Sequence, residues 1–224
     1  MISVCLPTRG RPDRFLHLCQ TLLDLADKPD EIEIISYHDN DDPSRYQYIG
    51  NHKEIVGDRI VMSDMWNKCW EKATGPIYMV TMDDIVFMTK GWDTQVYGAF
   101  DKYPDKIAYV YFASHPYMWR LGSTFCLHKN WTDTIGRLLP PYFPTHLSDN
   151  WINDIAKGLN RRHYLYYAWV MQDYIYDQTK KDYDVRHKQY PPWPIYRRKR
   201  RERVGEMEKL KKFIEEYQCQ NLVS

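Results

Sequence analysis

The chain has 224 residues, 43% of them hydrophobic, and a formal net charge of +1 at pH 7. This length suits one domain of ordinary size, or one domain with a small appendage, and a nearly neutral chain neither attracts nor repels polyanions strongly through bulk charge. The sequence contains no run of about 18 apolar residues, which excludes a membrane-spanning helix, and the N-terminus lacks the pattern of a secretion signal. We therefore expect a cytoplasmic protein.

The cysteines and histidines argue against two kinds of site. The five cysteines are scattered and show no Cys-x-x-Cys spacing, and the eight histidines show no paired spacing. Dispersed thiols, odd in number, fit a reducing compartment rather than a disulfide scaffold or a zinc site. A zinc hydrolase is likewise poorly supported.

The first part of the chain predicts a strand, a helix and a second strand. Residues 2–6 are apolar and β-prone, and Pro7 ends that run. Asp13 can cap a helix that extends to about residue 26, with apolar side chains on its inner face. Residues 31–37 are β-prone again. This order is typical of a βαβ unit with parallel strands.

Residues 77–87 are the stretch around which the chain is organised. An apolar, β-prone run leads to Asp83 and Asp84 and becomes apolar again directly afterwards, which predicts one buried strand. Two neighbouring carboxylates are costly to desolvate unless a cation or hydrogen bonds neutralise them, and ligands of open α/β sheets lie outside the carboxyl ends of strands. The stretch therefore predicts a divalent metal that holds a phosphorylated ligand. The alternative is that one aspartate only caps the next turn.

The remaining elements follow in chain order. Strands are predicted at residues 107–112, 123–127 and 163–170, and helices at 63–73, at 148–158 and in the C-terminal tail. The predicted fold class is α/β, with a mixed, mostly parallel sheet flanked by helices and a C-terminal helical tail. We divide the chain into a ligand-binding domain, residues 1–190, and a segment at 191–224 that holds a Pro-rich linker, a basic run and an amphipathic helix.

Polar residues follow the first two predicted strands. Arg9 and Arg11 come after the first strand, and a guanidinium group suits phosphate and carbonyl oxygens, although a solvated arginine is the ordinary alternative. Asp39 comes directly after the second strand and is the better candidate for ligand contact. Asp41 and Asp42 suit a plain turn equally well.

The motifs occur along the chain in an order that resembles that of the family 2-like glycosyltransferases of the GT-A fold, especially the compact members found in phages and bacteria. The similar stretches are residues 2–12, 39, 66–67, 73–75, 82–87, 91–93 and 148–151. The resemblance covers roughly residues 2–175. It implies a GT-A, Rossmann-like domain that binds a nucleotide sugar and an acceptor.

The resemblance implies a metal-dependent, inverting transfer of a hexose or pentose from a nucleoside diphosphate sugar to an acceptor hydroxyl. UDP is the expected nucleotide, and Mn²⁺ or Mg²⁺ is expected to neutralise the charge that develops on the departing diphosphate. The residues assigned to the nucleotide sugar are Pro7, Thr8, Arg9, Arg11, Asp39, Arg59, Asn67 and Asp83.

Asp84 is the expected metal ligand, and Asp83 is expected beside it, at the ribose or a metal-bound water. Two positions depart from the family pattern. Met82 stands where relatives often carry the first aspartate of Asp-x-Asp, and Gln172 and Asp173 stand where many relatives carry a histidine ligand. Oxygen ligands still suit Mg²⁺ or Mn²⁺. The assigned metal ligands are therefore Asp84, Asp83 and Asp173.

Asp149 matches the position of the general base that takes the proton from the acceptor. The alternative for Asp149 is structural, because a carboxylate at a helix N-terminus is favourable in any case. Asp154 is the fallback for the base.

The acceptor stays open between a saccharide or lipid-linked glycan and DNA with hydroxymethylated bases, which some phage enzymes of this kind glycosylate. A basic run beside Trp193 and Tyr196 suits phosphates and stacked bases, whereas a solvated helix face is the commoner origin of such a run. The residues assigned to acceptor contact are Trp92, Trp151, Arg197, Arg198, Arg200 and Arg201. Trp119 can also stack on a sugar, although core packing is the default for each tryptophan.

A third interpretation is a nucleotide-binding or nucleic-acid-binding module without catalysis, which the altered acidic motif keeps open. If the chain is phage-encoded, we expect it in the host cytoplasm. A homo-oligomer through the tail helix is also open.

Overall fold

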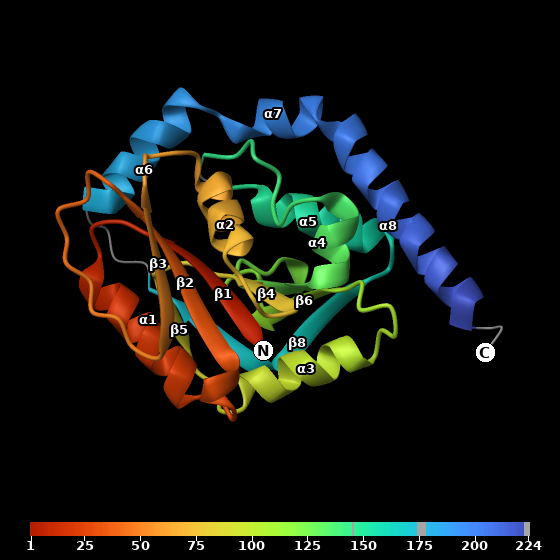
Figure 1. Ribbon diagram of the computed structural model, residues 1–224. Helices are drawn as coiled ribbons and strands as arrows, with labels where there is room; N and C mark the ends of the chain where they lie inside the picture. Colours follow the sequence, from red (N-terminus) through yellow and green to blue (C-terminus); the bar gives the residue numbers. More distant parts are fainter. Residues whose placement is uncertain (145, 174–177, 222–224) are drawn as a thin grey trace.

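The computed structural model describes residues 1–144, 146–173 and 178–221, and one eight-stranded sheet lies at its centre (Figure 1). The strand order is β3-β2-β1-β4-β7-β6-β8-β5. The strands are β1 (Ile2–Thr8), β2 (Ile32–Asp39), β3 (Asn51–Gly57), β4 (Ile77–Val80), β5 (Ile85–Phe87), β6 (Tyr109–Ala113), β7 (Phe125–His128) and β8 (Arg162–Gln172). The β3-β2-β1-β4 half is parallel throughout, β7 runs antiparallel to both its neighbours, β6 and β8 are parallel, and β5 is antiparallel to β8. This confirms the predicted mixed α/β sheet.

Helices cover both faces of the sheet (Figure 1). Helices α1 (Pro12–Asp24) and α3 (Trp92–Asp101) pack on one face and share its core. Helices α2 (Met62–Glu71), α4 (Lys129–Ile135), α5 (Ser148–Gly158) and α8 (Arg200–Asn221) share the core of the other face. Helices α6 (Gln178–Gln189) and α7 (Pro192–Arg198) join β8 to α8. In the described part of the chain, no helix is both long and apolar enough to cross a membrane.

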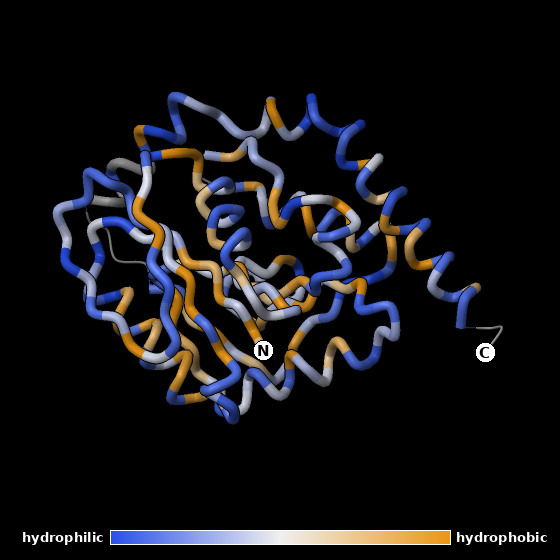
Figure 2. Tube along the Cα trace, in the orientation of Figure 1, coloured by the Kyte–Doolittle hydropathy of each residue, from blue (hydrophilic) through white to orange (hydrophobic). Residues whose placement is uncertain are grey.

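The predicted βαβ unit is confirmed, since β1 and β2 pair in parallel on either side of α1 in the chain. Both strands are buried on both faces, and the inner strands are predominantly apolar in Figure 2. Continuous apolar runs of this kind are typical of parallel strands that helices cover on both sides. The carboxyl ends of β1, β2 and β4 therefore meet at one edge of the sheet.

The prediction of a single strand at residues 77–87 is wrong. β4 ends at Val80 and pairs with β1, whereas β5 begins at Ile85 and pairs with β8 at the edge of the sheet. The acidic pair lies in the turn between the two strands. An apolar run on each side of two polar residues looks the same in sequence whether the strand continues or breaks.

Five helices and strands were not predicted: β3, α3, α4, α6 and α7. The predicted Pro-rich linker is wrong for α7, because proline is tolerated in the first turn of a helix, where its missing N–H costs nothing. β3 is an edge strand whose side chains are mostly exposed or half-exposed, so it lacks the apolar run of a central strand. α6 is almost entirely polar and lacks an apolar stripe. Both elements depend on contacts with distant parts of the chain.

The predicted tail helix is present as α8, and it packs on the core beneath α5. Leu210 and Ile214 are buried in the same cluster as Trp151. The Trp151 indole donates a 2.6 Å hydrogen bond to the buried Glu206, which also pairs with Arg137. Because a buried carboxylate needs such partners, this contact fixes how α8 lies on α5.

A second buried carboxylate joins the starts of β1, β2 and β4. Glu33 is fully buried and accepts hydrogen bonds from Ser3 Oγ at 2.5 Å, Lys53 Nζ at 2.6 Å and the Thr74 backbone N–H at 2.6 Å. Burial alone would raise the pKa of Glu33, but these donors outweigh it and lower the pKa to about 2.

We predict that Glu33→Gln lowers the free energy of unfolding by about 2–4 kcal/mol at neutral pH, because Lys53 loses its buried partner. The folded-state pKa of Glu33 lies below its unfolded value, so wild-type stability from this group is complete above about pH 4.3 and declines as the pH falls toward the folded value. Urea unfolding at about pH 7 and about pH 3 measures both effects, and the gap between the two proteins should narrow in acid.

Glu71→Gln is the matched control, because Glu71 pairs with Lys68 on the surface. Its effect should stay below about 0.5 kcal/mol. A similar loss in both variants would show that the Glu33 network contributes no more than a surface pair.

Candidate functional site

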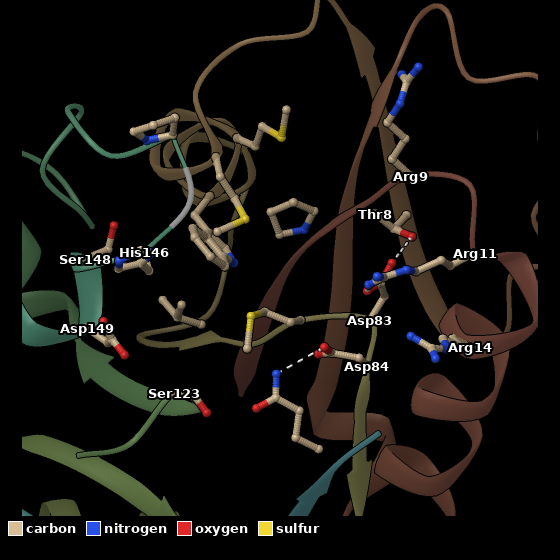
Figure 3. Close-up of a pocket in the computed structure, with 18 of the residues that line it drawn as sticks. Thr8, Arg9, Arg11, Arg14, Asp83, Asp84, Ser123, His146, Ser148 and Asp149 are labelled. Carbon is tan, nitrogen blue, oxygen red and sulfur yellow. Dashed lines mark hydrogen bonds and ion pairs between the residues drawn. The ribbon is translucent and has the colours of Figure 1, made fainter. Parts of the chain in front are cut away.

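A cavity of about 510 Å³ lies at the edge of the sheet where β1, β2 and β4 end (Figure 3). Its walls come from the segments that follow these strands, from the start of α5, from the end of β8 and from α6. The carboxyl edge of parallel strands is the usual place for a ligand in an open α/β sheet. The cavity is therefore the candidate functional site.

Asp83 connects the end of β1 to the turn after β4. Its Oδ2 accepts a 2.8 Å hydrogen bond from Thr8 Oγ1, and its Oδ1 pairs with Arg11 at 3.1 Å (Figure 3). Burial raises the pKa of Asp83 to about 6, although Arg11 opposes the shift. Both oxygens of this carboxylate are thus engaged by the protein.

Asp84 is held differently. Its Oδ2 accepts a 3.1 Å hydrogen bond from Gln172 Nε2, and its backbone carbonyl accepts one from the Asp173 N–H at 2.7 Å. Its Oδ1 is buried and has no hydrogen-bond partner among the described residues. Burial raises the pKa of Asp84 as well. A buried oxygen without a partner is costly, so this atom is suited to a ligand that supplies positive charge or a proton.

Asp39, the last residue of β2, lines one end of the cavity together with three arginines, which are Arg9, Arg59 and Arg186. Asp39 Oδ2 pairs with Arg9 at 3.0 Å and with Arg59 at 3.7 Å, whereas its Oδ1 is buried without a partner among the described residues. Burial raises the pKa of Asp39, and the Arg9 guanidinium opposes that shift. Arg186 of α6 lines the same end, and burial and the nearby Arg59 lower its pKa. Sequence analysis missed Arg186, because no local pattern marks it.

Asp42 has a structural role in the loop after β2. It accepts hydrogen bonds from the Gly10 N–H at 2.9 Å, the Ser44 N–H at 3.0 Å and Tyr46 Oη at 2.7 Å. Burial would raise its pKa, but these donors lower it to about 2. The turn interpretation holds for Asp42, which fastens the loop that carries Arg9.

Asp149 lies across the cavity from Asp83 and Asp84, at the start of α5 (Figure 3). Its carboxylate lines the cavity and accepts a 2.8 Å hydrogen bond from the Asn150 N–H. Burial raises the pKa of Asp149 to about 6, and the backbone amides of the first helical turn partly offset the shift. A carboxylate with such a pKa can accept a proton near neutral pH.

Comparison with known proteins gives a match in structure alone, because no family model and no curated protein sequence matches the chain. A structure of S. aureus TarS 1–349 in complex with UDP-GlcNAc superposes with a TM-score of 0.63 over 79% of this chain, at 13% identity. A mannosyltransferase, PcManGT from Pyrobaculum calidifontis, in complex with GDP-Man and Mn²⁺, superposes with a TM-score of 0.61 over 84% of this chain, at 12% identity. The chain has the GT-A fold.

The match confirms the fold that the sequence resemblance implied. The chain spans 59% of the length of the TarS structure and 61% of the mannosyltransferase. A third structure, TarS 1–349 in complex with UDP, superposes with a TM-score of 0.62 over 76% of this chain, at 14% identity.

Most of the predicted site residues line one cavity in this GT-A fold. The residues that the structure brings together there are Pro7, Thr8, Arg9, Arg11, Asp39, Arg59, Asp83, Asp84, Asp149 and Asp173. They come from segments far apart in the chain, which the predicted strand ends place at one edge.

Three predicted contacts need correction. Asn67 does not line the cavity but exchanges two 2.9 Å hydrogen bonds with the backbone of Leu139. Trp92 and Trp151 are fully buried, so neither ring can stack on an acceptor. The Trp92 indole donates to the Leu22 carbonyl at 2.9 Å, which fixes α3 against α1. All three residues hold the GT-A core together.

The predicted metal ligands do not form a closed cage. Within the described residues, no group of three or more His, Cys, Asp or Glu side chains could hold a metal ion. Asp83 is engaged by Thr8 and Arg11, and Asp173 Oδ2 lies 3.6 Å from Arg14 Nε. Asp84 Oδ1, by contrast, is buried and has no hydrogen-bond partner among the described residues. This donor set fits a cation that takes one or two protein carboxylates and completes its shell with phosphate oxygens and water, as Mg²⁺ usually does.

We predict that Asn67→Ala lowers the free energy of unfolding by about 1–3 kcal/mol, because the buried backbone of Leu139 loses its donor and its acceptor. Because Asn67 does not line the cavity, the variant should respond to UDP and GDP, the nucleotides of the neighbours' structures, in the same way as the wild type. Urea unfolding measures the first effect and calorimetric titration with UDP and GDP the second. If the variant bound the nucleotides more weakly and were as stable as the wild type, Asn67 would be a binding residue after all.

Proposed function

We propose that the chain is a glycosyltransferase that moves a sugar from a nucleoside diphosphate sugar to an acceptor hydroxyl, with a divalent metal. One observation carries this proposal: the buried Oδ1 of Asp84, which has no hydrogen-bond partner among the described residues, lies in a cavity with arginines at one side and Asp149 at the other. The GT-A neighbours whose structures hold UDP, UDP-GlcNAc or GDP-Man support the same reaction class.

The arginine-lined end of the cavity suits the nucleotide. Arg9, Arg59 and Arg186 supply guanidinium groups that match phosphate and carbonyl oxygens. Asp39 Oδ1, which has no partner among the described residues, can accept a hydrogen bond from an N–H group of the base or an O–H group of the ribose. Uracil and guanine both carry such N–H groups, and ribose carries the O–H groups in either nucleotide. We infer UDP because the TarS structures hold UDP or UDP-GlcNAc, with GDP as the alternative that the mannosyltransferase structure offers.

The metal would be held by Asp84, with Asp173 as a second carboxylate at the same wall. A divalent cation held by these carboxylates would supply the positive charge that stabilises the leaving diphosphate. Arg11 and Arg14 add positive charge on that side of the cavity, and Asp83 keeps Arg11 in place. Asp83 is thus a positioning residue rather than a ligand.

Asp149 suits the role of general base. It lies on the far wall from Asp84, so a sugar placed between them would expose its anomeric carbon to an acceptor on the Asp149 side (Figure 3). An acceptor hydroxyl that attacks from that side transfers its proton to Asp149 as the bond to the diphosphate breaks on the other. This geometry supports an inverting transfer.

DNA with hydroxymethylated bases stays a prediction as the acceptor. Arg197, Arg198, Arg200 and Arg201 are exposed on α7 and α8, and none of them lines the cavity. A role for them would require a long acceptor that reaches from the cavity to the tail helices.

We predict that Asp84→Asn weakens Mn²⁺-dependent binding of UDP by about 100-fold or more, because the neutral amide removes the charge that holds the cation. Calorimetric titration with UDP in the presence and absence of Mn²⁺ measures this. Asp101→Asn is the matched control, since Asp101 is an exposed aspartate paired with Lys106. Equal metal-dependent affinity in Asp84→Asn and the wild type would rule Asp84 out.

We predict that Asp149→Asn keeps UDP affinity but lowers the rate of sugar transfer by about 10²–10⁴-fold, the usual contribution of a general base. In the wild type, kcat at saturating UDP-sugar and metal should fall about tenfold per pH unit below about pH 6, because the protonated carboxyl group of Asp149 cannot accept a proton. kcat is used rather than kcat/KM, since Asp83, whose pKa is also about 6, contributes to the pH dependence of donor binding. Release of UDP from a UDP-sugar, with water as the acceptor, measures the rate and its pH dependence. Calorimetric titration with UDP measures the affinity.

Asp154→Asn serves as the control for the base, because Asp154 lies on the same helix but is bound to Tyr196 at 2.5 Å and Arg203 at 3.4 Å. Its rate and its pH profile should match the wild type. A pH profile without an acidic limb would assign the proton transfer to another group.

A further inference from the structure

Five aromatic side chains remain exposed on β8 and on the loop between β6 and β7, and one of them, Tyr117, lines the cavity. Trp119 is 61% exposed, Tyr166 63% and Tyr167 76%, and Tyr117 and Trp169 are exposed to a smaller extent. Rings of this size are usually covered, and exposed apolar groups that gather together mark binding surfaces. We call these five residues the aromatic platform.

The strand register places Trp169 on the face of the sheet that contributes Phe125 to the cavity. Tyr111 of β6 lies opposite Tyr164 of β8, and Ala113 lies opposite Trp169. Because alternate residues of a strand share a face, Trp169 lies on the same face as Tyr111. Tyr111 packs in one cluster with Phe125, which lines the cavity.

Ring contacts continue from this face to the exposed tyrosines. The ring centroids of Tyr111 and Tyr164 are 5.4 Å apart, those of Tyr164 and Tyr166 6.0 Å, and those of Tyr166 and Tyr167 5.0 Å. The register of β8 against β6 shifts between Leu165 and Trp169. This irregularity turns Tyr166 and Tyr167 outward, as β-bulges near active sites often do.

The loop that carries Trp119 is fastened to the sheet. Tyr111 Oη donates to the Trp119 carbonyl at 2.8 Å, Tyr109 Oη donates to the Gly122 carbonyl at 2.7 Å, and Arg162 donates to the Trp119 carbonyl at 2.6 Å. A Cβ at Gly122 would lie 2.4 Å from the Tyr111 Cβ, so the loop approaches β6 as closely as glycine permits. The backbone at Trp119 is thus held in place while its indole is exposed, and a ligand need not order it.

The platform continues into the cavity. Tyr117 belongs to the platform and also lines the cavity, and Ser123, just after the same loop, lines the cavity too. Ser123 lies on the side of Asp149 in Figure 3. A molecule that rests on the platform can therefore extend one end toward Asp149.

The chemistry of the platform favours a saccharide over a nucleic acid. Tyrosine and tryptophan present a broad apolar ring with a polar edge, which matches the C–H face and hydroxyl rim of a pyranose. In the described part of the chain, only Arg120 has its charge over a platform ring, 5.8 Å from the Trp119 centroid. Arg162 is engaged by backbone carbonyls. A nucleic acid needs several cations along its backbone.

We propose that the aromatic platform binds a saccharide of two or more pyranose units, and that the hydroxyl at one end of this saccharide is the acceptor presented to Asp149. The role as acceptor rests on the proposed glycosyltransferase function, whereas binding of the saccharide to the platform does not. Trp119 is the central contact, because its backbone is fixed and its ring is exposed.

Titration of the full chain with three neutral trisaccharides, cellotriose, chitotriose and mannotriose, tests the platform by NMR of the tryptophan indole N–H signals. We expect at least one trisaccharide to bind and to shift the Trp119 and Trp169 signals. Trp119→Ala should weaken that binding about tenfold, in line with the loss of one aromatic stacking contact. Trp193→Ala, which removes an exposed tryptophan of α7, should leave it unchanged.

Three results would overturn the platform: no trisaccharide binds, Trp119→Ala binds as well as the wild type, or both tryptophan variants lose affinity alike. A short oligothymidylate that shifts the platform signals where trisaccharides do not would assign the surface to a nucleic acid instead. Titration with UDP and Mn²⁺ separates the two proposals. Trisaccharide binding without nucleotide binding would overturn the glycosyltransferase function alone, and the reverse would overturn the platform alone.

Discussion

The hydrogen bonds that Thr8 and Arg11 make with Asp83 fix the turn on which the site depends. At this turn the chain leaves β4 in the middle of the sheet and starts β5 at its edge. A buried carboxylate without partners would cost several kcal/mol, so the turn is stable only where the end of β1 supplies the donors. The N–H of Asp173 bonds the same turn from the end of β8. Two distant segments, one after β1 and one after β8, therefore converge on one acidic pair.

The cavity has two acidic segments, the turn after β4 and the loop after β2. In each of them, one carboxylate is bonded by the protein and a neighbouring one keeps an oxygen for a ligand. In the turn after β4, Asp83 is saturated by protein donors, whereas Asp84 keeps a buried oxygen without a partner in the described part of the chain. After β2, Asp42 is saturated by three donors, whereas Asp39 keeps such an oxygen. In each pair, the carboxylate with several donors (Asp83 or Asp42) stabilises the backbone of the turn. That stabilisation offsets the cost of burying an oxygen without a partner on the other carboxylate (Asp84 or Asp39). The arrangement pre-organises two acceptor atoms for a ligand.

The sequence was informative where structure is set locally. The apolar runs of β1 and β2 predicted a parallel pair, and strand ends predicted where Arg9, Asp39 and Asp84 would meet. The break at residues 81–84 was not predictable, because only the pairing of β5 with β8 reveals it. Arg186 reaches the cavity on a helix without an apolar stripe. The sequence also does not show which tryptophans are buried. Trp92 and Trp151 are core residues and Trp119 is exposed, because long-range packing decides which side chains the rest of the chain covers.

The order of strands in the sheet separates the two halves of the cavity. The arginine-lined half is built mainly from the segments after β1, β2 and β4, whereas the half with Ser123 is built from β6 and β7. The end of β8 reaches the arginine-lined half as well, because Gln172 and the Asp173 N–H bond Asp84. β7 is antiparallel to both of its neighbours and joins the halves, so its pairing with β4 sets how far the two walls lie apart. Hydrogen bonds that hold the loop of Trp119 come from β6 and β8, and none of them involves the acidic turns. Substitutions at Trp119 can therefore change which molecule is bound there without disturbing the carboxylates and arginines of the opposite wall. Trp169 is less independent, because it lies on the strand that ends at Gln172, a partner of Asp84.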